Sequence, residues 1–219
     1  MTLLTTTALD LLRTEITLAC DTPDCRLVVS VPPQEGLKTS LLREICVGIL
    51  TSDRRQLLYV SYSTTAANLQ GRRIAGGRSG QLYCCGPDSA LLGRMFDVVV
   101  VDDPLSSPFR ARDSQVRADL NTWWDESVMC RLAPGASVVV ACSRTHPDDL
   151  YGHLQGQGWP SLNIPALADG VAPDALQRPV ETWLESIRGR TLQDWENLRA
   201  EMSSIDFATL YQGCPTCSR

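Results

Sequence analysis

The chain has 219 residues, 43% of them hydrophobic and 21% charged, which suits one compact α/β domain and leaves no room for two catalytic domains. Its formal net charge of −5 argues against a protein that wraps nucleic acid through bulk electrostatics, because neutralising phosphates requires clustered lysine and arginine. No apolar stretch approaches the roughly 18 residues of a membrane span, and the N-terminus lacks a signal-peptide pattern. We therefore expect a soluble, cytoplasmic protein without a membrane partner.

The beginning of the sequence predicts a helix, a strand and a second helix. Residues 7–19 carry leucine and isoleucine at helical spacing, and Arg26–Val31 is a β-branched run that Pro32-Pro33 stops. A helix from about Lys38 to Leu50 follows. Its apolar residues lie three and four positions apart, so one of its faces can pack on a sheet.

The central part predicts further strands with helical residues between them. Gln56–Ser61 has the composition of a strand, Thr64–Gly71 that of a helix start, and the glycines of residues 76–80 that of a flexible turn. Gln81–Cys85 is expected to add a short strand. Phe96–Val101 is the clearest strand, because a continuous apolar run implies burial on both faces of a parallel sheet.

The last part predicts a long helix, Ser114–Leu132, and a buried strand, Ala136–Cys142, with Pro134-Gly135 as the turn between them. Short helices around Glu181–Arg188 and Leu192–Glu201 follow. Strands and helices alternate through the sequence, a pattern typical of a mainly parallel α/β sheet with helices on both faces. Ligands bind such sheets at the carboxyl ends of the strands.

The cysteines are expected to be reduced thiols of a cytosolic protein. Cys46, Cys130 and Cys142 fall within apolar helix or strand patterns, where buried thiols are usual. Cys214-x-x-Cys217 lacks a second pair of ligands with the right spacing, so we expect no structural zinc.

An irregular phosphate-binding loop is predicted in SVPPQEGLKTS, residues 30–40. In the pattern G-x-x-x-x-G-K-[ST], backbone N–H groups cradle phosphates, the lysine reaches the outer phosphates and the hydroxyl holds Mg²⁺; Lys38 and Thr39 meet the last two requirements. Leu37 stands where the second glycine belongs, and Gly36 is displaced by one residue. Either the loop is rebuilt around Gly36 or nucleotide binding is weakened. In the simpler alternative, Lys38 only begins a surface helix.

Paired acids follow the strand Phe96–Val101 directly. Asp102 is expected to hold Mg²⁺, and Asp103 to orient or deprotonate an attacking water. Two solvated acids in a turn before Pro104 are the simpler alternative. Because a strand and a helix also flank Lys38, the two motifs together predict a P-loop NTPase fold with a site for ATP and Mg²⁺.

Polar residues also follow the strand Ala136–Cys142. Ser143, Arg144 and His146 are expected beside the two earlier strand tips, where a polar sensor of the γ-phosphate fits. An N-terminal helix cap formed by Ser143 or Thr145 explains the same stretch equally well.

These segments resemble the ATPase domain of the large terminase subunit, the DNA-packaging motor of tailed bacteriophages and their prophages. The resemblance covers nearly the whole chain. RLVVSVPPQEGLKTS is similar to the family's strand and Walker A loop, YVSYSTTAANLQGR to its next strand and helix, and FDVVVVDDP to its Walker B element. DSQVRADLNTWWDESVMCRLAPGASVVVACSRTHPDDL is similar to the stretch through the coupling motif, and WPSLNIPALAD and FATLYQG to later segments.

The resemblance implies an ATPase domain at residues 1–200 that powers translocation of double-stranded DNA into a procapsid. Residues 201–219 would form a tail or linker towards a nuclease domain, and since no acidic cluster for that nuclease is present, we expect no DNA cleavage. The implied partners are DNA, bound weakly by the chain alone, the portal protein and the small terminase subunit. The chain would form a homo-oligomeric ring when assembled and a monomer in isolation.

The resemblance also implies roles for individual residues. The expected nucleotide contacts are Gln34, Glu35, Gly36, Leu37, Lys38, Thr39, Ser40 and Ser143, and the expected Mg²⁺ ligands are Thr39 and Asp102. Asp103 would act on the water, and Ser143-Arg144 would couple hydrolysis to movement. The arginine that stabilises the transition state is left open among Arg94, Arg117, Arg144 and a residue of a neighbouring subunit.

Two rival hypotheses remain at this point. A catalytically weakened P-loop remnant could serve as a protein-docking module, and Leu37 and the missing second domain are its support. An unrelated P-loop ATPase, such as a helicase fragment, is the third possibility.

Overall fold

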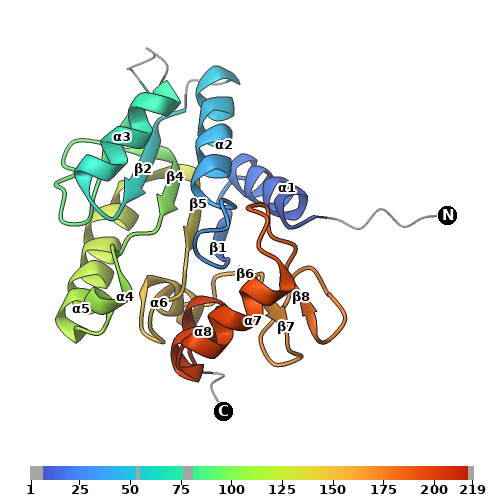
Figure 1. The fold of residues 1–219 in the computed structure, drawn as a ribbon. Helices are drawn as coiled ribbons and strands as arrows, with labels where there is room; N and C mark the ends of the chain where they lie inside the picture. Colours follow the sequence, from blue (N-terminus) through green and yellow to red (C-terminus); the bar gives the residue numbers. More distant parts are fainter. Residues whose placement is uncertain (1–6, 53–54, 76–80, 217–219) are drawn as a thin grey trace.

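A six-stranded sheet organises the part of the chain that the computed structural model describes, residues 7–52, 55–75 and 81–216. All neighbouring strands in it are parallel, in the order β3-β2-β4-β5-β1-β6 (Figure 1). The strands are β1 Arg26–Ser30, β2 Leu57–Ser61, β3 Leu82–Cys85, β4 Phe96–Asp102, β5 Leu132–Cys142 and β6 Ser161–Asn163. The predicted parallel α/β fold is confirmed.

Helices cover both faces of this sheet. Val98 and Val100 of β4 join the apolar cluster that α1, α2 and α3 cover, whereas Val99 and Val101 join the cluster beneath α5 and α6. The continuous apolar run of β4 therefore has the predicted cause, burial on both faces. The helices are α1 Ala8–Asp21, α2 Thr39–Ser52, α3 Thr64–Ala75, α4 Pro108–Ala111, α5 Ser114–Trp123, α6 Leu150–Gly156, α7 Leu192–Glu201 and α8 Ser204–Leu210.

The long helix predicted for residues 114–132 is wrong at its end. Regular helix stops at Trp123, and a π-helical turn, Trp124–Val128, and a 3₁₀ turn, Met129–Arg131, lead directly into β5. The wider turn buries Trp124 and Val128 completely in the core beside β5. The helix changes its pitch here, which a prediction based on regular helical spacing does not reveal.

The predicted turn at Pro134-Gly135 is also wrong, because both residues belong to β5. The pairing of β4 with β5 shifts from Phe96–Leu132 to Val98–Ser137, so the extra residues of β5 form a bulge. Gly135 has a φ of +78° in this bulge, a conformation that costs glycine little. The sequence signal for a backbone irregularity was real, but it marks a bulge inside a strand.

The C-terminal part of the chain packs against the helices beside β1. A two-stranded antiparallel sheet pairs β7, Leu167–Ala168, with β8, Thr182–Trp183. The short helix predicted for residues 181–188 is wrong, since β8 and a loop occupy this segment. The helix predicted for residues 192–201 is confirmed as α7, which Thr191 begins with a capping box.

Residues 201–216 contain α8 and contribute to the main core. Phe207 and Tyr211 stack with ring centroids 5.7 Å apart, and both pack in the cluster that holds Trp195 of α7. The domain boundary at residue 200 remains a prediction.

The described cysteines differ in burial and in bonding state. Cys46 and Cys142 are buried as predicted, but Cys130 is exposed, because the apolar pattern of α5 ends before the 3₁₀ turn that carries it. Cys20, Cys25, Cys84 and Cys85 are also free thiols. Cys214 is disulfide-bonded, so the expectation of reduced thiols is wrong for this residue.

Two further findings concern the described residues only. None of their helices combines the length and apolar character that crossing a membrane requires. The glycine turn expected at residues 76–80 lies outside this part of the chain.

We predict that Trp124→Ala lowers the free energy of unfolding by about 3–5 kcal/mol, because it opens a cavity in a close-packed core. Trp124 is fully buried and meets the ring of Trp159 edge-on, with centroids 6.1 Å apart. Urea unfolding followed by circular dichroism measures the change. Leu92→Ala is the control: Leu92 is 78% exposed, so its loss is expected to change stability by about 0.5 kcal/mol or less. Equal losses in the two variants would contradict the assignment of the π-helical turn to the core.

Candidate functional site

The two sequence motifs meet at the carboxyl edge of the sheet. Nζ of Lys38, in the loop after β1, donates to Oδ1 of Asp103 at 2.6 Å and to Oγ of Ser143 at 2.7 Å. The backbone N–H of Ser143 donates to the same Asp103 oxygen at 2.8 Å. We call these three residues the Lys38 cluster. Three loops, from β1, β4 and β5, each supply one member, and β5 lies between the other two strands.

Gly36 gives the predicted phosphate loop its shape. Gly36 has a φ of +74° and Gln34 a φ of +65°, whereas Leu37 is not among the residues with positive φ. The side chain of Leu37 is buried in the core cluster that also contains Leu41 and Leu42 of α2. The loop is therefore rebuilt around Gly36, the first of the two alternatives, and the leucine anchors it to the core.

Glu35 does not present its side chain to a ligand. Its carboxylate is fully buried, accepting a hydrogen bond from Nε of Arg190 at 2.6 Å and another from Oγ of Ser186 at 2.5 Å. The expected nucleotide contact by this side chain is thus replaced by an anchor for the loop before α7. The sequence carried no signal for this pairing, since 155 positions separate Glu35 from Arg190.

Asp102 is a buried acid with one satisfied oxygen. The Tyr59 hydroxyl donates to its Oδ2 at 2.8 Å, while its Oδ1 is buried and has no hydrogen-bond partner among the described residues. Burial raises the pKa of Asp102, and the Asp103 carboxylate raises it further; the hydroxyls of Thr39 and Tyr59 and the Lys38 ammonium act in the opposite direction. Burial and the Asp102 charge also raise the pKa of Tyr59, which keeps its hydroxyl a donor.

This arrangement fits a hard divalent cation. An unpaired buried carboxylate oxygen gains a partner when Mg²⁺ binds, and the Thr39 hydroxyl lies on the same side. No cluster of three His, Cys, Asp or Glu side chains is positioned to hold a metal within the described residues. Mg²⁺ would therefore take its other ligands from water and phosphate oxygens, as it commonly does. Tyr59 was missed from the sequence because a tyrosine among apolar strand residues has the pattern of a core residue.

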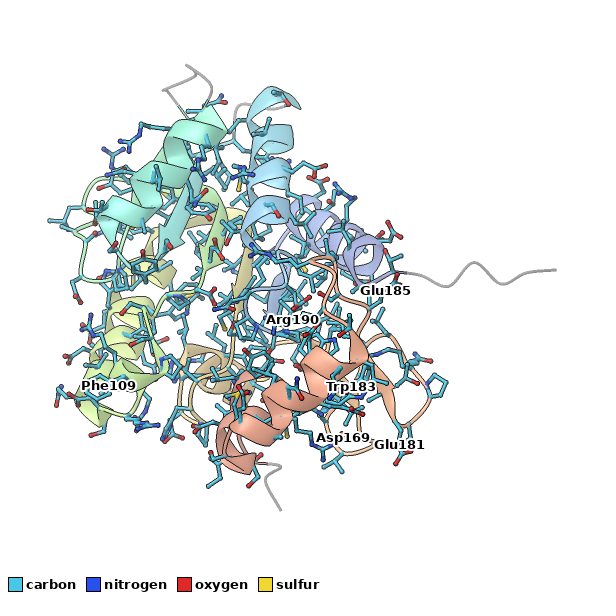
Figure 2. All side chains as sticks on the ribbon, in the orientation of Figure 1. Phe109, Asp169, Glu181, Trp183, Glu185 and Arg190 are labelled. Atoms are coloured by element: carbon cyan, nitrogen blue, oxygen red, sulfur yellow. The ribbon has the colours of Figure 1, made fainter. Side chains whose placement is uncertain are left out.

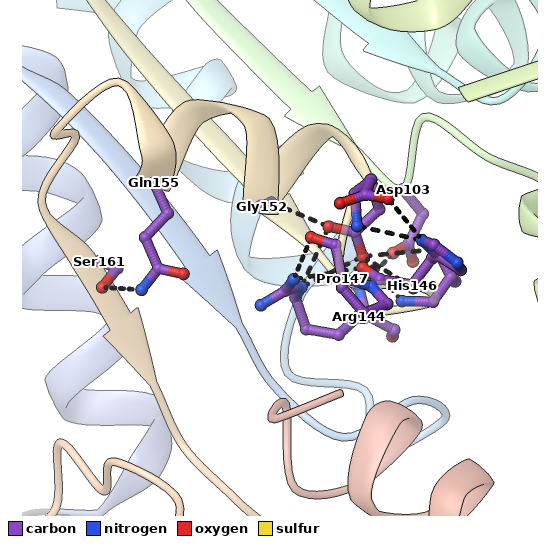
Figure 3. A network of polar contacts seen from close by, with 11 residues as sticks. Asp103, Arg144, His146, Pro147, Gly152, Gln155 and Ser161 are labelled. Atoms are coloured by element: carbon purple, nitrogen blue, oxygen red, sulfur yellow. Dashed lines mark hydrogen bonds and ion pairs between the residues drawn. The ribbon is translucent and has the colours of Figure 1, made fainter. Parts of the chain in front are cut away.

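Arg144 stabilises the loop between β5 and α6. Its Nε lies 3.1 Å from both carboxylate oxygens of Asp149, and its Nη2 donates to the carbonyls of His146 and Pro147 (Figure 3). The guanidinium also lies over the ring of Tyr151, 4.3 Å from its centroid. Arg144 is only 4% exposed, so its charged group is used to hold the conformation of this loop.

The helix cap that was left open for this stretch belongs to Asp149. Its side chain accepts the backbone N–H of Gly152 at the start of α6, as well as the N–H groups of Thr145 and His146. Ser143, by contrast, lies in the Lys38 cluster. The cap hypothesis was right for the segment and wrong for the residue.

The remaining expected site residues lie in different places. Gln34 is exposed at the mouth of the site, and Ser40 Oγ donates to the carbonyl of Gly36 at 2.7 Å. Arg117 donates to the carbonyl of Ala111 at 2.5 Å. Arg94 stacks on Tyr83 before β4 begins, and the length of that strand, about 20 Å, separates it from the acids. The structure does not bring Arg94 to the Lys38 cluster.

A cavity of about 520 Å³ opens beside the cluster. Its lining includes Thr39, Asp102, Asp103 and Ser143, together with residues of α3 and of the loop after Asp103. This volume lies in the range of small-molecule sites.

Comparison with known proteins gives a match in fold. No protein-family model matches the chain, and no curated protein matches it. The large terminase of a thermophilic bacteriophage, in complex with ADP, matches with a TM-score of 0.54 and 8% identity, over 93% of this chain and 52% of that chain. The same terminase in complex with ATP-gamma-S matches with a TM-score of 0.53 and 10% identity over the same shares.

The chain thus spans about half the length of these terminases. It shares the fold of that part, which confirms the structural expectation drawn from the sequence resemblance.

We predict that Asp102→Asn stabilises the ligand-free protein at pH 7. Because burial raises the pKa of Asp102 from its ordinary value of 3.8, the folded protein favours the protonated carboxyl. The carboxyl's contribution to stability is thus present at low pH and is lost as the pH rises through the raised pKa. The side-chain amide of the Asp102→Asn variant does not ionise, so the variant does not lose this stability as the pH rises. Thermal unfolding at pH 7 is expected to show a higher Tm for the variant, with the gain vanishing as the pH falls towards 3.8. A lower Tm at pH 7 would show that the charged form is the stabilising one.

Proposed function

We propose that the chain is the ATP-hydrolysing motor domain of a phage terminase large subunit. The convergence of Lys38, Asp103 and Ser143 beside the unpaired oxygen of Asp102 carries this proposal. Its fold adds support, since terminases with the same fold have been solved with ADP and with ATP-gamma-S. Each contact lies where a triphosphate bound at the carboxyl edge of a parallel sheet would meet it.

The phosphates would lie on the loop of residues 34–38 and the first turn of α2. Backbone N–H groups at the start of this 14-residue helix attract anions, and Lys38 reaches the outer phosphates from the same segment. Thr39 and Asp102 would hold Mg²⁺, which neutralises charge on the outer phosphates when it is bound. Gly36 supplies the positive φ with which this loop turns towards α2.

Asp103 has two roles in this proposal. Without a nucleotide, its carboxylate pairs with the Lys38 ammonium. When the γ-phosphate of a bound nucleotide accepts the hydrogen bonds of that ammonium instead, the carboxylate becomes available to a water molecule. The water oxygen forms a bond to the γ-phosphorus as the bond to the bridging oxygen breaks. ADP leaves, and Asp103 accepts the proton of the water. Ser143 touches both Lys38 and Asp103, so it is placed to sense this exchange.

Coupling to movement would pass from Ser143 to its neighbour Arg144. Arg144 fixes Asp149, which caps α6, so a shift of Ser143 is transmitted to the start of that helix. The guanidinium groups of Arg94, Arg117 and Arg144 contact Tyr83, Ala111 and Asp149 instead. Of the sources that the sequence left open for the transition-state arginine, these contacts favour a neighbouring subunit of a ring.

The assembly would translocate double-stranded DNA into a procapsid in the host cytoplasm, with a portal protein and a small terminase subunit as partners. Leu37 was one of the two supports for the rival proposal, a weakened remnant used for docking. Because Gly36 takes the positive φ and Leu37 packs inward, that argument loses its force.

Lys38→Ala is expected to weaken binding of a fluorescent ATP analogue in the presence of Mg²⁺ by about 100-fold, since it removes a charged hydrogen-bond donor from the phosphates. Fluorescence anisotropy of the full chain measures the affinity. Arg72→Ala, an exposed position near the end of α3, is the matched loss of one positive charge and is expected to bind as the wild type does. Equal affinity in Lys38→Ala and the wild type would refute the phosphate-loop assignment.

Asp103→Asn is expected to retain nucleotide binding and to lose turnover by about 10²- to 10⁴-fold, because the amide cannot accept the proton of the water. Phosphate release under single-turnover conditions measures the rate, with anisotropy on the same samples as the binding control. A variant that hydrolyses ATP at the wild-type rate would remove Asp103 from the mechanism.

A further inference from the structure

The loop Ser186–Arg190 lies against the phosphate loop, held there by Glu35. The Glu35 carboxylate, with no exposed surface, takes hydrogen bonds from Oγ of Ser186 and Nε of Arg190. Arg190, labelled near the centre of the view in Figure 2, also packs on the ring of Trp195, with its guanidinium carbon 5.1 Å from the ring centroid. Breaking such a pair would leave a buried charge unpaired, so the two loops are expected to stay together.

This anchoring determines where Arg188 lies. Oγ of Ser186 accepts the backbone N–H of Arg188 at 3.2 Å, and Gly189 turns the chain with a φ of +79°. A methyl group placed on Gly36 would lie only 3.6 Å from Nε of Arg188. The side chain of Arg188 therefore lies within van der Waals reach of Gly36, the glycine with positive φ in the predicted phosphate loop.

The charge of Arg188 is not neutralised by a neighbouring acid. Glu35 pairs with Arg190, and no carboxylate among the described residues lies within ion-pair distance of Arg188. Its side chain is exposed, whereas Lys38 is already paired with Asp103. A free guanidinium next to the anion-binding loop is a ready partner for phosphate oxygens, which arginine contacts through two N–H groups at once.

We propose that Arg188 is a second cationic contact for the phosphates of the bound nucleotide, and that Glu35 positions it through Ser186 and Arg190. This inference rests on the proposed function. It assigns Glu35, expected from the sequence to contact the nucleotide, a positioning role instead. It also supplies in this chain a phosphate-binding arginine that the sequence motifs did not reveal.

Titration with a fluorescent ADP analogue tests the proposal by binding alone. Arg188→Ala is expected to weaken binding about tenfold or more and to make the remaining affinity less sensitive to salt, because one charge contact is gone. Arg188→Lys keeps the charge and is expected to recover part of the affinity. Glu35→Gln is expected to give a smaller loss by releasing the loop. Arg72→Ala, again an exposed arginine outside the site, is the control, and circular dichroism verifies the fold of each variant.

The outcomes separate this inference from the proposed function. If Lys38→Ala loses binding while Arg188→Ala binds ADP with wild-type affinity and salt dependence, the role of Arg188 is overturned and the motor assignment stands. If the wild type binds no nucleotide, both are overturned. Equal losses in the alanine and lysine variants with unchanged salt dependence would also exclude a charge contact.

Discussion

The ion pair between Lys38 and Asp103 is the interaction on which this account depends. It joins the loop after β1 to the loop after β4 across the intervening strand β5, whose own loop adds Ser143. A buried ammonium requires a counter-charge, and in the ligand-free protein an acid of the same site supplies it. A phosphate can replace that acid because it offers the lysine the same type of charged hydrogen bond. In the proposed mechanism, Asp103 becomes available as a general base once a phosphate binds the lysine.

Asp102 provides the second constraint. The fold buries this carboxylate beneath the edge of the sheet and pairs only one of its oxygens, which costs stability in the ligand-free protein. Such a cost is common where binding requires a group that the fold alone would not favour. Glu35 is a contrasting case, because its buried charge is satisfied within the protein and serves to fix a loop.

The sequence predicted what depends on local patterns. The continuous valine run predicted that β4 lies in the interior and that Asp102 and Asp103 lie at the edge of the sheet. The strand order of the sheet then brings these acids close to Lys38. The sequence could not predict features that depend on distant partners: the ion pair of Glu35 with Arg190, the hydrogen bond of Tyr59 to Asp102 and the place of Arg188 beside Gly36. Gly135 shows a third case, in which the composition marked a backbone irregularity but left turn and bulge indistinguishable.

The most direct test of the central claim is a titration of the wild-type chain with a labelled ATP analogue, with and without Mg²⁺. If Lys38, Asp102 and Asp103 form one triphosphate pocket, binding saturates and is tighter when Mg²⁺ is present. Absence of saturable binding under both conditions would contradict the account.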